Sequence, residues 1–83
     1  MNLRYEIRRI DKANKSNPYR AETLLMVCIN HIPEERKNAL SYLEEIRQIE
    51  SVWREYASEN GLDESLFRCW VAQNLEIASV LGW

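Results

Sequence analysis

The pattern of apolar and polar residues predicts an all-α protein. Apolar side chains recur at spacings of three and four over most of the 83-residue chain, which is the period of an amphipathic helix. Only two Gly and two Pro are present, too few for the frequent tight turns of a β-sandwich. The expected architecture is a small four-helix bundle that forms a single helical domain over residues 1–83, and a dimer of this bundle is compatible with the pattern.

The N-terminal segment 1–17 predicts a short basic helix. Leu3 and Ile7 fall on one helical face, and basic residues occupy the other positions. Leu3, Tyr5 and Ile7 also alternate with charged residues at period two, which leaves a strand as the alternative. Because a single strand has no partner in this chain, a strand here would require a second chain.

Two prolines divide the following part of the chain. Asn17 as N-cap and Pro18 at the first helical position predict a second helix over 18–31. Pro33 ends that helix and opens a third, which meets no helix-breaking residue before Gly61. The third helix is therefore expected to contain about 28 residues and to be about 42 Å long.

The third helix has the clearest periodic pattern. Its apolar residues recur with the period of 3.5 that a coiled-coil seam requires. Because so long a helix exceeds what an 83-residue monomer needs, part of this seam is available for contact with a second copy of the chain, in a homodimer, or with a different protein. The alternative, which the pattern slightly favours, is that neighbouring helices cover it. The seam comprises Ala39, Tyr42, Ile46, Ile49, Trp53 and Tyr56.

A helical hairpin is predicted after the third helix. Gly61 closes that helix, and Asp63 is the expected N-cap of a fourth. The fourth helix is expected to run without interruption to Gly82, beyond which Trp83 can fold back on it.

Charge is distributed unevenly along the chain. The net charge is −2, but residues 1–20 contain six basic and two acidic residues, whereas residues 21–83 contain five basic and eleven acidic ones. A basic segment over 1–17 thus precedes an acidic helical body over 18–83. This asymmetry favours contact with an anionic partner; the alternative is that the basic helix neutralises the acidic helices beside it.

Neither a catalytic site, a cofactor site nor a metal site is predicted. His31 is the only histidine, and Cys28 and Cys69 are the only cysteines, so no metal-ligand spacing is present. Both cysteines are interpreted as reduced and buried. The longest apolar run, residues 24–29, is far shorter than the roughly 20 residues that span a bilayer, and the N-terminus is charged, so we expect a cytoplasmic protein with no membrane contact.

Two short stretches resemble a family of small helical enzymes. Residues 3–11, Leu-Arg-Tyr-Glu-Ile-Arg-Arg-Ile-Asp, and residues 61–63, Gly-Leu-Asp, before an apolar helix, look like the helical chorismate mutases. That resemblance implies a mutase whose site takes several cations from a long first helix and a glutamine from late in the last helix. Pro18 interrupts the first helix here, and Ala78 and Trp83 stand among the late positions, so the family's site residues are not carried over.

A nucleic-acid-associated regulator is the alternative function. A basic, alternating N-terminus followed by helices is similar to ribbon-helix-helix repressors, in which paired strands of a dimer enter the major groove. The break at residues 17–18 and the long third helix depart from that fold. The acidic composition favours a protein partner over nucleic acid. The residues available for phosphate contacts are Arg4, Arg8, Arg9, Lys12 and Lys15.

The leading interpretation is a non-enzymatic regulatory protein that binds another protein, in an inhibitor, antitoxin-like or adaptor role. The predicted long amphipathic helix and the lack of a catalytic motif favour this interpretation. Acidic residues on the polar side of that helix would set the orientation of the bound partner and the rate of association. Trp and Tyr dominate binding hot spots, although Trp53 and Trp70 can equally belong to the core. The expected partner-binding residues are Tyr42, Ile49, Trp53, Tyr56, Trp70 and Trp83.

Overall fold

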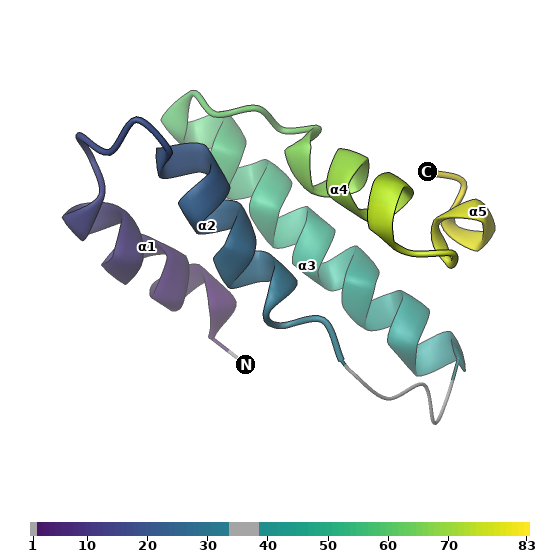
Figure 1. The fold of residues 1–83 in the computed structure, drawn as a ribbon. Coiled ribbons are helices and arrows are strands. Elements are labelled where there is room, and N and C mark those ends of the chain that lie inside the picture. The colour runs from purple at the N-terminus through teal and green to yellow at the C-terminus, as the bar shows by residue number, and fades with distance from the viewer. Residues whose placement is uncertain (1, 34–38) are drawn as a thin grey trace.

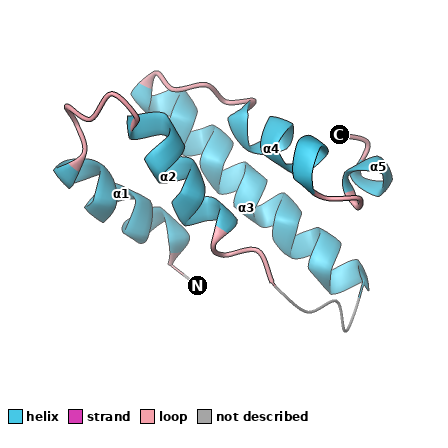
Figure 2. Cartoon of the chain, viewed as in Figure 1, coloured by secondary structure: helices cyan, strands magenta, loops and turns pink. Residues whose placement is uncertain are grey.

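All of the regular secondary structure in the part of the chain that the structure describes is helical. The computed structural model describes residues 2–33 and 39–83, and no strand occurs among them (Figure 2). The all-α prediction is confirmed, and the N-terminal segment is a helix rather than a strand. In chain order the helices are α1 (Leu3–Ala13), α2 (Arg20–Ile29), α3 (Ala39–Asn60), α4 (Leu66–Asn74) and α5 (Ala78–Leu81), as Figure 1 shows.

Helix α3 is the element around which the others are arranged. It contacts α1, α2 and α4, while α1 and α2 lie antiparallel to each other on one side of it (Figure 1). The described part of α3 contains 22 residues. The predicted first turn of this helix, residues 34–38, lies outside the described residues.

The side chains of the α3 seam that the structure describes are buried within the chain. Tyr42, Ile46, Ile49, Trp53 and Tyr56 are each at most 5% exposed. The same core includes Ile7 from α1, Leu24 from α2 and Phe67 from α4. Neighbouring helices therefore cover this seam, so in this conformation its side chains are not presented to a partner.

The predicted hairpin between α3 and α4 is present. Gly61 has a φ of +69°, and the N–H of Leu62 donates to the carbonyl of Ala57 at 2.9 Å, which is the Schellman arrangement for ending a helix. The Asp63 carboxylate accepts from the N–H of Ser65 at 2.9 Å and closes a turn, so the prediction of Asp63 as N-cap is wrong and α4 begins at Leu66 with Ser65 as its N-cap. The buried indole of Trp53 donates to the carbonyl of Asp63 at 3.0 Å and fixes the turn against α3.

The predicted start of the second helix at Pro18 is wrong by two residues. The Asn17 side chain accepts from the N–H of Tyr19 at 2.9 Å, so it closes a turn instead of capping a helix that starts at Pro18. Helix α2 consequently begins at Arg20.

The prediction of one uninterrupted fourth helix is also wrong. Leu75 has extended backbone angles of −124° and 127°, and this break separates α4 from α5. Because of it the chain turns back, and the Trp83 ring packs edge-on against Phe67 with ring centroids 6.3 Å apart. In a continuous helix these two residues would be about 24 Å apart along the axis, so the break buries apolar surface that a straight helix would leave exposed.

The Gly61 conformation predicts a stability change that arises from the backbone alone. A Cβ added at Gly61 meets nothing within 4 Å, so only the left-handed angle penalises a side chain. We expect Gly61→Ala to lower the free energy of unfolding by about 1 kcal/mol, and Gly61→Asn to lower it less, because Asn tolerates this conformation better. Urea unfolding followed by helical circular dichroism measures both, and equal stability of Gly61→Ala and the wild type would contradict the explanation.

Candidate functional site

The five basic residues predicted to contact phosphates do not form one surface. Arg4 and Lys15, the first and last of the five in sequence, form ion pairs with carboxylates of the same chain. The Arg4 guanidinium lies 2.9 Å from a Glu55 carboxylate oxygen and also donates to Glu59, while the Lys15 ammonium lies 3.0 Å from Asp11. Arg4 therefore joins α1 to α3, Lys15 makes a local ion pair, and both cations are only partly available to a ligand.

Arg8, Arg9 and Lys12 form the available set. All three are exposed, and in residues 2–33 and 39–83 no carboxylate lies within ion-pair distance of any of them. Together with Tyr5, which is 62% exposed, they line a single hollow of about 360 Å³. We call these four residues the α1 face.

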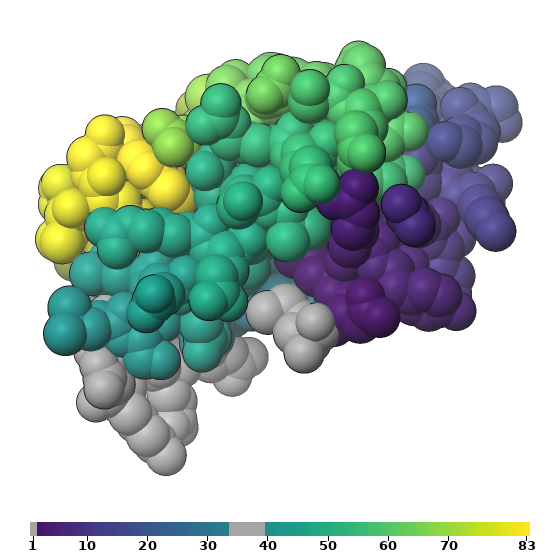
Figure 3. All heavy atoms as spheres, turned by 180° about the vertical axis from the view of Figure 1, so that it is seen from behind, coloured from purple at the N-terminus to yellow at the C-terminus, as the bar shows by residue number. Residues whose placement is uncertain are grey.

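Helical geometry explains why the α1 face points outward. Its residues are three, four and seven positions after Tyr5, which places them on one side of the helix. The opposite side of α1 carries Leu3, Ile7 and Asp11, all at most 3% exposed. Figure 3 shows α1 at the molecular surface beside α3. Because one side of α1 is buried in the core, the α1 face on the opposite side is directed toward solvent.

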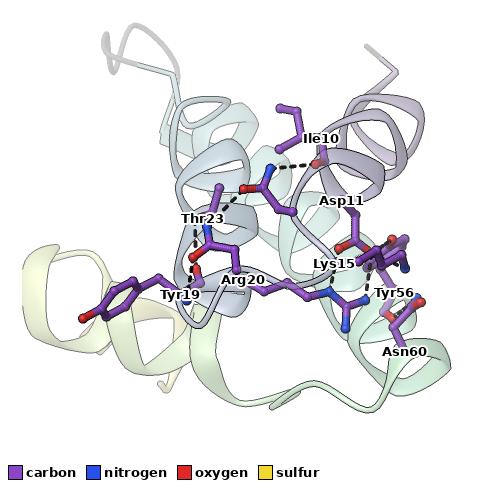
Figure 4. Close-up of polar contacts among 10 residues, drawn as sticks. Ile10, Asp11, Lys15, Tyr19, Arg20, Thr23, Tyr56 and Asn60 are labelled. Atoms are coloured by element: carbon purple, nitrogen blue, oxygen red, sulfur yellow. Dashed lines mark hydrogen bonds and ion pairs between the residues drawn. The ribbon is translucent and has the colours of Figure 1, made fainter.

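A second cluster surrounds the buried carboxylate of Asp11, which is 1% exposed (Figure 4). Arg20 donates from Nε to one carboxylate oxygen at 2.6 Å and from Nη2 to the other at 2.8 Å. The hydroxyl of Tyr56 and the ammonium of Lys15 donate to that second oxygen. Asp11 therefore joins α1 to α2 and α3.

The pKa values in this cluster suit a structural role better than a catalytic one. Hydrogen bonds from Arg20, and then from Tyr56 and Lys15, outweigh burial and hold the pKa of Asp11 far below its usual range. Burial and the hydrogen bond to Asp11 raise the pKa of Tyr56 to about 12. A general acid or base needs a pKa near the working pH, so neither group is tuned for proton transfer at neutral pH.

The two cysteines differ in their surroundings. Cys28 is buried as predicted, and burial raises the pKa of its thiol to about 12, so the nucleophilic thiolate is scarce at neutral pH. The prediction that Cys69 is buried is wrong, because Phe67 and Val71 occupy the inward side of α4 and Cys69 faces solvent. His31 bonds to Glu6 at 2.7 Å, linking the end of α2 to α1.

A shallow groove of about 430 Å³ runs along the outer side of α3. Its most buried member is Glu50, 6% exposed, whose carboxylate lies 3.3 Å from Arg68 Nε and 3.6 Å from Arg54 Nε. No local feature of the sequence indicates that Glu50 is buried, because the contact depends on Arg68 of α4. In the described ranges, no group of three or more His, Cys, Asp or Glu is arranged to hold a metal ion.

The residues predicted to bind a protein partner are not gathered on one surface. Tyr42, Ile49, Trp53 and Tyr56 are core residues, each at most 5% exposed. Trp70 and Trp83 are partly buried against this core. The Trp83 ring also lies 4.9 Å from the Arg68 guanidinium carbon, a cation–π distance.

Comparison of the chain with known proteins identifies no relative. Neither the protein-family models, the curated proteins nor the solved structures contain a match to the chain. Helix α1 ends at Ala13, so the long first helix of the chorismate mutase site is absent from the described chain. No described helix has the length and apolar character needed to cross a membrane.

The Asp11 cluster predicts a stability difference that depends on pH. We expect Asp11→Asn to lower the free energy of unfolding by about 2 kcal/mol near neutral pH, because the two cations lose their counter-charge. The pKa of Asp11 is lowered in the folded state, so its stabilising effect is complete above the unfolded pKa of about 3.9 and is lost as the pH falls below it. Urea unfolding at several pH values should show the difference between the two proteins shrinking below about pH 4.

The matched control for this experiment is Glu44→Gln, which removes an exposed carboxylate of α3. Its stability should differ little from that of the wild type at every pH. An Asp11→Asn penalty that stays constant down to low pH would contradict the assignment of the stabilising charge to Asp11.

Proposed function

We propose that this protein is a non-enzymatic, nucleic-acid-associated regulator that binds the phosphate backbone through the α1 face. The observation that carries the proposal is the convergence of Arg8, Arg9 and Lys12 with Tyr5 on one exposed hollow, where no carboxylate of residues 2–33 or 39–83 is within ion-pair distance of the three cations. When exposed cations of this kind contact phosphates, they displace the counterions condensed on the nucleic acid. This release of counterions is the main source of sequence-independent affinity for nucleic acid.

The remainder of the chain supports binding rather than catalysis. The buried ionisable cluster at Asp11 is fully engaged with Arg20, Tyr56 and Lys15, and the Cys28 thiol is enclosed. These groups stabilise the helices that present the α1 face. An overall charge of −2 keeps contact with phosphates confined to that face, because the acidic body repels them elsewhere.

Binding to another protein, including a second copy of the chain in a homodimer, is the second candidate. It is supported by Trp70 and Trp83, which are only partly buried although aromatic side chains of this size often anchor interfaces. A homodimer would sediment with a concentration-dependent coefficient, and Trp83→Ala should abolish that dependence if the α4–α5 corner is the interface.

The first proposal predicts binding that weakens with salt. Three phosphate contacts to a single strand give a slope of about −2 for the logarithm of the binding constant against the logarithm of salt concentration. Fluorescence anisotropy of a labelled oligodeoxythymidine measures this slope. We expect Arg8→Gln to reduce its magnitude by about 0.7, because one contact is lost.

Two comparisons make this measurement decisive. Arg47→Gln removes another exposed arginine, which belongs to α3 and does not line the hollow, and should leave the slope unchanged. Polyglutamate tests whether the face binds any polyanion, and it should compete weakly because it carries no phosphates. The proposal is wrong if the oligonucleotide does not bind, or if the two arginine variants behave alike.

A further inference from the structure

The α1 face contains one residue that phosphate binding does not require. Tyr5 is 62% exposed and lines the same hollow as Arg8, Arg9 and Lys12. An exposed tyrosine alone is ordinary, but this ring adjoins a row of cations on a single helix for which the described residues supply no carboxylate partner. Aromatic rings interleaved with cations are the arrangement by which proteins hold single-stranded nucleic acid.

From this juxtaposition we infer that the Tyr5 ring is a stacking platform for an unpaired base, so that the α1 face selects single-stranded over double-stranded nucleic acid. The inference rests on the proposed function and specifies its ligand. In a duplex the bases are stacked on one another and a ring at the phosphate surface cannot reach their faces. In a single strand a base can turn onto the ring while its neighbouring phosphates contact the cations.

The dimensions of the α1 face fit a short segment of strand. Tyr5 and Lys12 are seven residues apart, about 10 Å along the helix axis, and Arg8 and Arg9 lie between them. A nucleic-acid strand that lies along this axis would contact the Tyr5 ring at one end. Over the remaining length it would contact the positive charges of Arg8, Arg9 and Lys12. The contact therefore combines one base with the phosphates that follow it.

Neighbouring charges define the path of the strand. On the side of α3, Arg4 is held by Glu55 and Glu59, whose side chains are more than half exposed. These carboxylates repel phosphates, so a strand cannot cross from α1 onto α3. The favourable course is parallel to α1, over Arg8, Arg9 and Lys12.

The test compares a single-stranded oligodeoxythymidine, a duplex of equal length and an abasic strand of equal length, by fluorescence anisotropy at one salt concentration. We expect Tyr5→Ala to weaken binding of the oligodeoxythymidine about tenfold, because one stacked base is lost. Binding of the duplex and of the abasic strand should change less than twofold, since neither presents a free base. Tyr5→Phe should retain the wild-type affinity, because stacking needs the ring and not the hydroxyl.

Tyr19→Ala is the matched control. Tyr19 is 69% exposed, and its ring points away from the Asp11 cluster and lies at the start of α2 (Figure 4). This variant should bind all three probes as the wild type does. Because both tyrosines are exposed, the variants should keep their helical circular dichroism, which confirms that any loss of binding is local.

The outcomes separate this inference from the proposed function. If Tyr5→Ala binds the oligodeoxythymidine normally, or weakens binding of all three probes equally, the stacking platform is refuted while salt-dependent phosphate binding stands. If the wild-type protein binds none of the probes, the proposed function fails and the inference fails with it. A tenfold loss of affinity for the oligodeoxythymidine alone supports both the stacking platform and the proposed function.

Discussion

The buried carboxylate of Asp11 is the interaction on which the arrangement of the helices depends. A charged group at 1% exposure is costly unless its oxygens accept hydrogen bonds, and here Arg20, Tyr56 and Lys15 donate to the two carboxylate oxygens. These donors come from α2, α3 and the end of α1, so satisfying one carboxylate requires three segments to meet in one geometry. Because hydrogen bonds are directional, this network restricts the rotation of α1 more than apolar contacts alone would.

The orientation of α1 in turn decides what the protein shows to solvent. With Ile7 and Asp11 directed inward, Arg8, Arg9 and Lys12 must lie on the opposite side of the helix. The proposed binding surface is thus a consequence of core formation, and it is presented by a helix whose position is fixed before any ligand arrives. Such preorganisation reduces the entropy that binding must overcome.

Several features were predictable because they depend on local pattern. Helical periodicity identified the apolar side of α3, and Gly61 marked its end. Periodicity shows which side of a helix is apolar but not what covers it, so the seam was equally compatible with a partner. The burial of Asp11 was beyond prediction, since it depends on Tyr56, 45 residues away in the chain. The break at Leu75 was missed because neither Gly nor Pro marks it.

The two sides of α1 are under different constraints, and this has a consequence for how the protein can change over evolutionary time. Substitutions at Arg8 or Lys12 remove no contact that holds the helices together, whereas substitutions at Asp11 do. Exchange of the outward residues can therefore alter ligand preference while the fold keeps its stability. One eleven-residue helix joins a structurally constrained anchor to a surface that the fold does not constrain, which is a favourable starting point for divergence of the proposed binding specificity.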